Sequence, residues 1–353
     1  MERFVYTASP SRIVFGADSI DQLPAEIERL GAQRALVLCT PNQRGQAQAI
    51  ADRLPGRVAW IFDEAAMHVP IETARRARAL ASELKADCAL AVGGGSTVGL
   101  GKAIALESGL PIIAVPTTYA GSEATPIYGI TEGGLKKTGR DPRVLPRVVI
   151  YDPKLTLSLP LDLTVTSAIN AMAHAAEGLY AHDGNPVISL MAEEGIRACA
   201  ASLQPLRENP RDLPARSLAL YGAWLCGTVL GAVSMGLHHK LCHTLGGTFD
   251  LPHAQVHTVV LPHALRYNAS AAPEAMARIA KALGVADAPM GFFELARTHG
   301  AAVSLKAIGM PANGLEQAVD LAVSNQYPNP RPLDSVALRT LLDRALDGAP
   351  PGP

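Results

Sequence analysis

The chain has 353 residues, a length that suggests two domains of ordinary size. Hydrophobic residues make up 48% of it and charged residues 18%, which is typical of a well-packed globular protein and excludes a disordered or fibrous chain. The 31 Lys and Arg residues balance 32 Asp and Glu residues. This balance argues against a protein built to bind nucleic acid, whose affinity normally comes from neutralising phosphates.

The cysteines and the N-terminus indicate the compartment. Five scattered cysteines, an odd number without a CxxC pair, argue against a disulfide framework and favour reduced thiols. The first residues lack a basic-then-apolar signal pattern, and no run of about 18 apolar residues is present that could span a membrane. We therefore expect a cytoplasmic protein that binds neither nucleic acid nor a membrane.

Short apolar runs alternate with amphipathic helical patterns in the first half of the chain. The runs have the length of strands and cover residues 34–40, 57–63, 88–95, 111–118 and 147–153. Nearly continuous apolar strands separated by helices predict a parallel sheet that is covered on both faces. After about residue 155 the apolar period is helical almost throughout. We predict a dinucleotide-binding α/β domain over 1–154 and an all-helical catalytic domain over 155–353.

Two loops at predicted strand ends carry groups that suit a nucleotide. The stretch AVGGGSTVGLGKAIAL leads from a strand into a helix, with Gly94, Gly95 and Ser96 at the helix start. Glycines let the backbone approach a phosphate, and the free N–H groups of a helix start favour an anion. The stretch VPTTYAGSEAT adds three hydroxyls, on Thr117, Thr118 and Ser122. Either loop alone also fits a tight turn or a helix cap, but two on neighbouring strands favour a nucleotide site.

Eight of the ten histidines fall between residues 174 and 263. Asn170 and His174 are four residues apart, as are His239 and His243, and side chains at this spacing share one face of a helix. His253 follows a turn that can return it to the same face. Three converging imidazoles are typical of a Zn²⁺ or Fe²⁺ site. The histidines that we interpret as structural hydrogen-bonding residues are His182, His257 and His263.

The motifs of both halves together resemble those of the iron-containing alcohol dehydrogenase superfamily, which has the dehydroquinate synthase-like fold. The resemblance extends from FGADSIDQL near the start to NQYPNPRP near the end, and it rests on GGGSTVGLGK, PTTYAGSE, NAMAH and HKLCHTLGGTFDLPH. It implies a Rossmann-like parallel sheet followed by an all-α domain. Carried over to this sequence, the metal-ligand positions are Asn170, His174, His239 and His253. The resemblance places His243 beside the reacting carbon.

Three departures from the family pattern bear on the chemistry. Asn170 replaces the ligand aspartate, Gly99 replaces the aspartate of the glycine loop, and the hydroxyl loop is one residue shorter. An amide oxygen is a poor ligand for Zn²⁺ or Fe²⁺, so metal binding should weaken. Without a metal, the imidazoles would form a pocket that donates hydrogen bonds and attracts an anion once one ring is protonated.

The longer motifs resemble one branch of this superfamily, which reduces maleylacetate to 3-oxoadipate with NADH or NADPH during the breakdown of aromatic compounds. A small dicarboxylate substrate suits a pocket of histidines. We hypothesise that the nicotinamide supplies the hydride, that His243 or His253 donates the proton, and that no metal is needed. His174 and His239 would hold the carboxylate or the carbonyl oxygen. Three candidates for binding the distal carboxylate stay open: Tyr128, Arg140 and Lys240.

The same resemblance implies a cofactor site and an assembly. Gly94, Gly95 and Ser96 should cradle the pyrophosphate. Thr117 and Thr118 should lie near the adenine and the phosphates, with Ser122 in the same loop, and Lys136 matches a lysine near the nicotinamide ribose. An acid after the first predicted strand would favour NAD over NADP, but Thr40 stands there, so we predict that both NADH and NADPH are used. The resemblance also implies a homodimer.

Three rival functions share parts of this pattern. A metal-dependent alcohol dehydrogenase could keep zinc or iron on three histidines, although Asn170 speaks against it. A lyase of the dehydroquinate synthase type would use NAD without net redox change, which the long match to reductase motifs disfavours. A non-catalytic nucleotide-binding protein would share the fold, but the clustered histidines argue against it.

Overall fold

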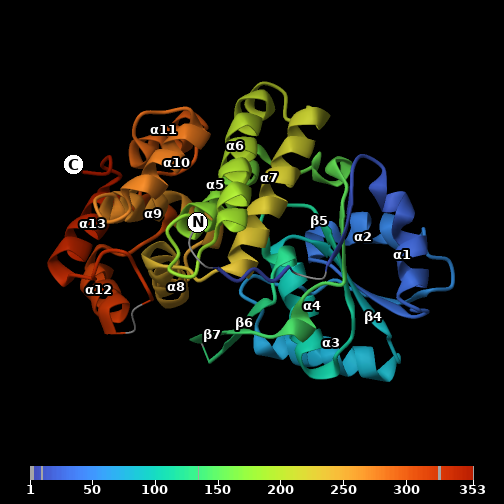
Figure 1. Ribbon diagram of the computed structural model, residues 1–353. Helices are drawn as coiled ribbons and strands as arrows, with labels where there is room; N and C mark the ends of the chain where they lie inside the picture. Colours follow the sequence, from blue (N-terminus) through green and yellow to red (C-terminus); the bar gives the residue numbers. More distant parts are fainter. Residues whose placement is uncertain (1–3, 9–10, 134, 325–326, 353) are drawn as a thin grey trace. The chain divides into compact units, whose positions relative to one another are not determined.

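The chain folds into two compact units (Figure 1). The computed structural model describes residues 4–8, 11–133, 135–324 and 327–352. One unit consists of Ala8–Leu159, and the other contains the chain from Pro160 onward. The domain boundary expected between residues 154 and 155 stays a prediction, and it lies a few residues before this division.

A six-stranded parallel sheet forms the centre of the first unit. In spatial order its strands are β1 (Arg12–Phe15), β8 (Val148–Tyr151), β5 (Ile112–Pro116), β4 (Cys88–Gly93), β2 (Ala35–Leu38) and β3 (Val58–Phe62). Five of them fall within the five predicted apolar runs, and the predicted α/β fold class is confirmed. The sixth, the edge strand β1, pairs with β8 and lies outside every predicted run.

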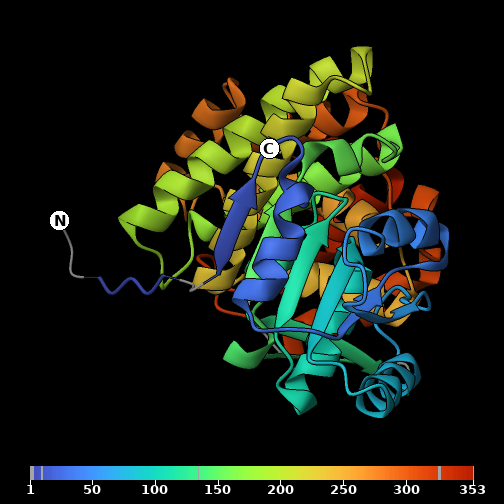
Figure 2. The same cartoon turned by 90° about the vertical axis from the view of Figure 1, so that its right-hand side faces the viewer.

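Helices cover both faces of this sheet (Figure 2). α1 (Leu23–Arg29) and α2 (Arg44–Ala51) pack on one face, and α3 (Ile71–Glu83) and α4 (Gly95–Ser108) pack on the other. Successive side chains of β2 enter the two cores in turn, since Val37 belongs to the first core and Leu36 and Leu38 belong to the second. Burial on both faces explains why the strands read as unbroken apolar runs.

A two-stranded antiparallel hairpin, β6 (Ile127–Glu132) with β7 (Leu135–Arg140), completes this unit. Gly133, with φ of 57°, lies in the turn between the two strands. Ile130 of β6 packs into the core formed with α3 and α4. The sequence does not predict this hairpin because β7 reads LKKTGR, which lacks the alternation of apolar residues that marks a strand.

The second unit is helical throughout its described elements. Its α-helices are α5 (Leu161–Gly178), α6 (Pro186–Glu208), α7 (Leu213–Ala232), α8 (Leu237–Phe249), α9 (His253–Asn268), α10 (Pro273–Leu283), α11 (Ala288–Thr298), α12 (Leu315–Ser324) and α13 (Ser335–Asp347), and two short 3-10 helices lie between α11 and α12. The predicted all-α character of this part of the chain is therefore confirmed. One apolar core joins α8, α9, α12 and α13, so packing against α12 and α13 fixes the helices α8 and α9 that carry histidines.

α6 and α7 approach each other closely because each contributes a glycine at the contact. A Cβ atom at Gly195 would lie 2.7 Å from Sγ of Cys226. A Cβ atom at Gly222 would lie 2.6 Å from Sγ and 2.8 Å from the backbone nitrogen of Cys199. Protein interiors are too densely packed to absorb such overlaps, so this contact requires glycine on both helices.

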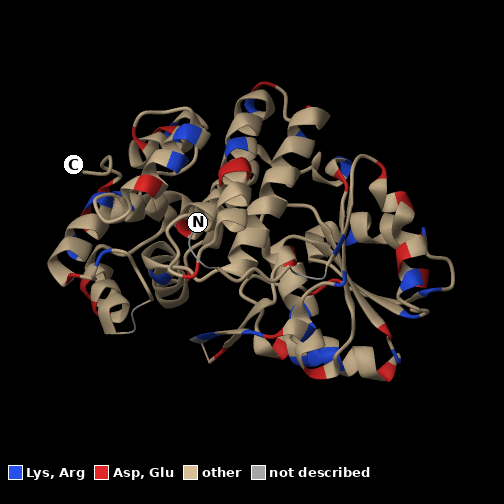
Figure 3. Cartoon of the chain, in the orientation of Figure 1, with Lys and Arg blue, Asp and Glu red and all other residues tan. Residues whose placement is uncertain are grey.

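Charges of both signs occur together on outer helices such as α3, as Figure 3 shows. Arg75 pairs with Glu72 on the same helix, and Arg76 pairs with Glu64 in the loop before it. Exposed pairs of this kind contribute at most about 1 kcal/mol each, and they leave little net charge on the helix surface.

Among the described residues, no helix by itself has the length and apolar composition needed to cross a bilayer. α7 and α8 meet those criteria only when taken together, and the two are bent by 97° at their junction.

Candidate active site

The predicted nucleotide loops converge at the carboxyl ends of the adjacent strands β2, β4 and β5. Thr40, after β2, donates a hydrogen bond to Oε1 of Gln43 at 3.0 Å. Nε2 of Gln43 in turn donates to Oγ1 of Thr117, after β5, at 2.7 Å. Gln43, which the sequence analysis did not single out, therefore links two predicted cofactor residues across the glycine loop that follows β4.

Packing around the glycine loop excludes a side chain at two positions and leaves room at a third. Gly93 has φ of +151°, and a Cβ atom there would lie 2.5 Å from Oγ1 of Thr97 and 2.6 Å from Oε1 of Gln43. A Cβ atom at Gly94 would lie 2.8 Å from Oγ1 of Thr118. At Gly95 the nearest neighbour would stand at 3.8 Å, which is ordinary contact. The fold therefore requires glycine at Gly93 and Gly94, whereas it does not explain Gly95.

The start of α4 has the features of an anion site. Its N-cap residue is Gly94, in an extended conformation, and no side chain caps the first turn that holds Gly95 and Ser96. The buried hydroxyls of Thr97 and Ser122 have no hydrogen-bond partner among the described residues. Free N–H groups at a helix start favour a negative group, and buried hydroxyls without partners suit a polar ligand.

Lys102 stabilises the loop after β5 that carries Ser122. Its Nζ donates to the carbonyl oxygens of Ser122 and Ile127, both at 2.6 Å, and to Oγ1 of Thr125 at 2.9 Å. Burial lowers the pKa of Lys102 to about 7, and the nearby carboxyl of Glu123 opposes this shift. Three acceptors match the three N–H bonds of an ammonium group, so Lys102 fixes the shape of the loop that carries Ser122.

Three further predicted residues lie on the β6–β7 hairpin. Lys136 pairs with Thr131 across the two strands, and burial lowers its pKa. Tyr128 lies on β6 opposite Gly139, where a Cβ atom would meet the tyrosine hydroxyl at 2.5 Å. Arg140 is the last residue of β7. The structure groups these residues on one small element but does not single out any of them as a carboxylate ligand.

Three helices of the second unit bring the predicted histidines together. α5 carries Asn170 and His174, α8 carries His239 and His243, and α9 begins at His253. The ring centroids of His174 and His239 lie 4.9 Å apart, and those of His239 and His243 lie 6.1 Å apart. The remaining contacts run through one further ring, His257, which lies 5.0 Å from His239 and 4.3 Å from His253.

His257 therefore belongs to the centre of the cluster, although its sequence pattern suggested a separate structural role. Its Nδ1 lies 3.0 Å from Nε2 of His238, and its Nε2 has no hydrogen-bond partner among the described residues. Of the other two histidines interpreted as structural, His182 is exposed. His263 is buried, and its Nε2 likewise lacks a partner in the described part of the chain.

A buried carboxylate, Glu177, sets the electrostatics of the cluster. Burial alone would raise its pKa. The pKa is instead lowered to about 2 by the hydrogen bond with His239, by the charges of His239 and His238, and by the N–H of Gly236. Burial, assisted by His239 and opposed by Glu177, lowers the pKa of His238 to about 3. Burial and the neighbouring rings hold the pKa of His257 well below its usual value. His238 and His257 are therefore neutral at pH 7, and Glu177 is ionised.

His243 and His253 are the accessible members of the cluster. Both are partly exposed, whereas His174 and His239 are almost completely buried. Nδ1 of His243 lies 3.1 Å from the hydroxyl oxygen of Tyr327. A ligand that enters from solvent can reach His243 and His253 first.

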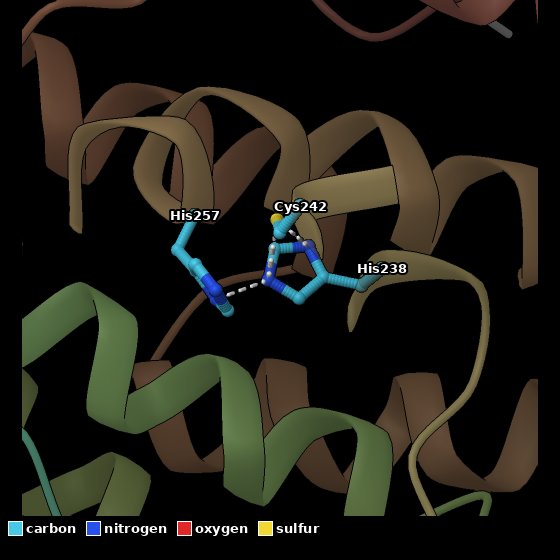
Figure 4. Close-up of side chains that lie close together, drawn as sticks. All are labelled: His238, Cys242 and His257. Carbon is cyan, nitrogen blue, oxygen red and sulfur yellow. Dashed lines mark hydrogen bonds between the residues drawn. The ribbon is translucent and has the colours of Figure 1, made fainter. Parts of the chain in front are cut away.

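A second group of side chains, His238, Cys242 and His257, resembles a metal site at first sight (Figure 4). The atoms that could bind a metal lie within 4.8 Å of one another. However, Sγ of Cys242 lies at similar distances from both nitrogens of the His238 ring, 3.6 Å from Nε2 and 3.9 Å from Nδ1, so it is not directed at one of them. Nε2 of His238 already contacts His257. Burial raises the pKa of the Cys242 thiol well above its usual range. Metals bind the thiolate, so we interpret this group as hydrogen-bonded packing.

The four positions that the family pattern assigns to a metal do not fit an iron or zinc ion as they are arranged. Asn170 offers an uncharged amide, whose Oδ1 is buried and has no hydrogen-bond partner among the described residues. Nδ1 of His174 lies 2.7 Å from Nε2 of His239, which is a hydrogen bond. Two nitrogens on one tetrahedral ion, with bonds of about 2.0–2.1 Å, would stand roughly 3.3 Å apart. We therefore derive no chemical step through a metal.

Two residues of the cluster escaped the sequence analysis. Glu177 follows His174 by three residues on α5, so its place on the same helix face was readable from the spacing. Tyr327 belongs to NQYPNPRP, far along the chain from His243, and no pattern in the sequence pairs the two. Lys240, a candidate for the distal carboxylate, lies with its Nζ 5.7 Å from the centre of the Tyr327 ring.

Two family models match the chain, one over each unit. Iron-containing alcohol dehydrogenase matches residues 10–153, and the C-terminal part of the Fe-containing alcohol dehydrogenase family matches residues 164–346. The chain belongs to the iron-containing alcohol dehydrogenase family. The family resemblance read from the motifs is thus confirmed, and the chain is an oxidoreductase.

Individual relatives narrow this assignment. The chain is 65% identical over 351 residues to a maleylacetate reductase of Burkholderia cepacia, covering 99% of this chain and 100% of that one. It is 56% identical over 349 residues to a maleylacetate reductase of Sphingobium indicum, with 99% of each chain covered. The crystal structure of maleylacetate reductase from Agrobacterium tumefaciens superimposes with a TM-score of 0.95 at 54% identity, covering 99% of this chain and 100% of that one.

Proposed function

We propose that this enzyme reduces maleylacetate to 3-oxoadipate with NADH or NADPH. The observation that carries the proposal is the 65% identity, over nearly the whole chain, to a protein named maleylacetate reductase. The site supports it, because an uncharged Asn170 and several histidines suit a dicarboxylate better than the acidic ligand of the family pattern would.

The substrate defines what the side chains must do. Maleylacetate has a carbon–carbon double bond conjugated with a ketone. A bound nicotinamide would supply the hydride for the carbon β to the ketone, and the side chains of the site would have to deliver a proton to the α carbon. We assign proton donation to His243 or His253, since these are the partly exposed histidines of the cluster. Asn170, His174 and His239 complete the proposed site.

The first unit would hold the cofactor. We propose that the pyrophosphate binds the start of α4 at Gly94, Gly95 and Ser96, where no side chain caps the helix. The groups assigned to the rest of the cofactor are those of Thr40, Thr117, Thr118, Ser122 and Lys136. Because no acid stands at Thr40, we propose that NADH and NADPH both serve. A kcat/KM for NADPH more than roughly a thousandfold below that for NADH would contradict this choice.

The first experiment concerns the metal. Protein treated with a chelator is assayed for bound metal and for NADH oxidation with maleylacetate. We expect turnover without metal, because the donor set at Asn170, His174 and His239 does not fit the ion. Loss of turnover that Zn²⁺ or Fe²⁺ restores would instead mean that the three histidines hold the ion and that the enzyme is a metal-dependent reductase.

The second experiment concerns the proton donor. His243→Ala should lower kcat by about 10²–10⁴-fold, the usual contribution of a positioned general acid, while the Kd for NADH stays the same. Activity within about threefold of the unchanged enzyme would exclude His243 and leave His253. Light scattering of the purified protein would test the homodimer that we also propose.

A further inference from the structure

The completely buried carboxylate of Glu177 lies among several hydrogen-bond donors. Its Oε1 accepts hydrogen bonds from the backbone N–H of His238 at 2.9 Å and from the hydroxyl of Tyr180 at 3.0 Å. Its Oε2 accepts from the N–H of Gly236 at 2.9 Å and of His239 at 3.2 Å, and it lies 2.7 Å from Nδ1 of His239. Four of these five contacts come from groups that carry a hydrogen whatever the state of the His239 ring.

The same side chain caps a helix from outside. α8 begins at Leu237 and has no side-chain cap of its own. The carboxylate of Glu177, which belongs to α5, instead satisfies N–H groups at the start of α8, where the helix dipole also favours a negative charge. Held in this way, the carboxylate is ionised and can only accept hydrogen bonds.

This acceptor determines where the hydrogens of two imidazoles lie. Because Glu177 only accepts, the 2.7 Å contact requires a hydrogen on Nδ1 of His239. In the neutral ring Nε2 then carries a lone pair. That nitrogen lies 2.7 Å from Nδ1 of His174, so His174 must supply the hydrogen between the two rings. Nε2 of His174 is left with a lone pair of its own.

We propose that Glu177 is a positioning residue that fixes the tautomers of His239 and, through it, of His174. In this order the two N–H groups of the neutral pair are already donated, one to Glu177 and one to Nε2 of His239, so the pair keeps no N–H for a ligand. A substrate carboxylate would then be held by His243, His253 or the amide of Asn170, and not by His174 and His239 as the sequence suggested. This last step rests on the proposed function, whereas the order of the hydrogens does not.

The direct test reads the ring nitrogens by NMR. Full-length protein labelled with ¹⁵N-histidine is examined without substrate near pH 7.5, and the signals of His174 and His239 are identified from His174→Gln and His239→Gln proteins. We expect a protonated Nδ1 and an unprotonated Nε2 on both rings. A protonated Nε2 on either ring would overturn the proposal, whatever the activity of the enzyme.

Substitutions test whether Glu177 is the cause. Glu177→Leu removes the acceptor, so the hydrogen of His239 should move to Nε2 and that of His174 should follow to its own Nε2. Tyr180→Phe is the matched control, because it removes one donor from the other oxygen of the same carboxylate and should leave both rings unchanged. If the hydrogens of His239 and His174 stayed on Nδ1 in Glu177→Leu, Glu177 would not be what fixes the tautomers. If that protein does not fold, the ring nitrogens of the unchanged enzyme still decide.

Kinetics provide a separate measurement. Loss of a carboxylate behind a site histidine typically costs about 10–100-fold in activity. We expect Glu177→Leu to lower kcat by that factor without changing the KM for NADH, and Glu177→Gln, which can keep an acceptor oxygen toward His239 but turns an NH₂ group toward the N–H of His238, to recover part of the loss. Equal defects in both variants would contradict the acceptor role. If the unchanged enzyme does not oxidise NADH with maleylacetate, the proposed function fails while the NMR result still stands.

Discussion

Replacing Gly93 by alanine tests how tightly the glycine loop is built. The new Cβ would lie 2.5 Å from Oγ1 of Thr97 and 2.6 Å from Oε1 of Gln43, at a φ of +151°. The backbone conformation costs a side chain about 1–3 kcal/mol, and overpacking adds about 1–3 kcal/mol. The free energy of unfolding of the α/β unit should therefore fall by about 2–6 kcal/mol, which corresponds to a Tm lower by about 4–24 °C in calorimetry. An unchanged Tm would refute the packing argument.

Gly95→Ala is the matched substitution two residues later. The nearest atom to its Cβ would be 3.8 Å away, so the folded unit has room for the methyl group, and its stability should stay the same or rise by about 0.5–1 kcal/mol. The same methyl group would obstruct a pyrophosphate at the start of α4, so the Kd for NADH should increase more than about tenfold, as measured by titration calorimetry. An unchanged Kd would mean that the phosphates bind elsewhere, even if Gly93→Ala behaves as expected.

Three further predictions follow from buried contacts. Gly222→Ala places Cβ 2.8 Å from the backbone nitrogen of Cys199 and should destabilise the α6–α7 contact by about 1–3 kcal/mol, whereas an unchanged Tm would show that the helices can separate freely. Lys102→Met removes three hydrogen bonds from the loop that carries Ser122, so the KM for NADH should rise more than about tenfold, and an unaltered KM would exclude this supporting role. The pKa of Glu177 is lowered from 4.5 to about 2 on folding, so its contribution is complete above pH 4.5 and is lost as the pH falls toward 2. Urea unfolding at pH 6 and pH 3 should then show a loss larger by about 2 kcal/mol in the unchanged chain than in Glu177→Gln, and equal losses would contradict the assigned pKa.

The sheet could be predicted from the sequence to the extent that its strands are buried on both faces. β4 reads CALAVG and β5 reads IIAVP, and every residue of both is buried, so the apolar runs mark them directly. β1 has only four residues, RIVF, at the edge of the sheet, and just one of them is fully buried. β7 reads LKKTGR and pairs along its length with β6. Strands that depend on pairing more than on burial leave no apolar pattern to read.

The site divides in the same way between local and distant information. The spacing of Asn170 with His174, and of His239 with His243, is a property of one helix turn, and it indicated the cluster. Gln43 links two loops whose strands lie far apart in the sequence, and Tyr327 reaches His243 from a segment 84 residues later. Such contacts form only after the chain has folded. The sequence therefore indicated the histidines and the loops, but not the distant residues that contact them.

The charge of the histidine cluster follows from where its carboxylate lies. At residue 170 the family pattern has an aspartate, and a carboxylate there would face a metal directly, whereas Asn170 has no charge. Glu177 provides a buried negative charge two helical turns later on α5, but it faces Nδ1 of His239 and the N–H groups at the start of α8. A carboxylate in that position orders imidazole hydrogens and leaves the accessible side toward His243 and His253 free of negative charge from Glu177. A dicarboxylate can approach such a surface without direct repulsion from an acidic ligand, so the exchange at Asn170 and the burial of Glu177 favour the same class of substrate.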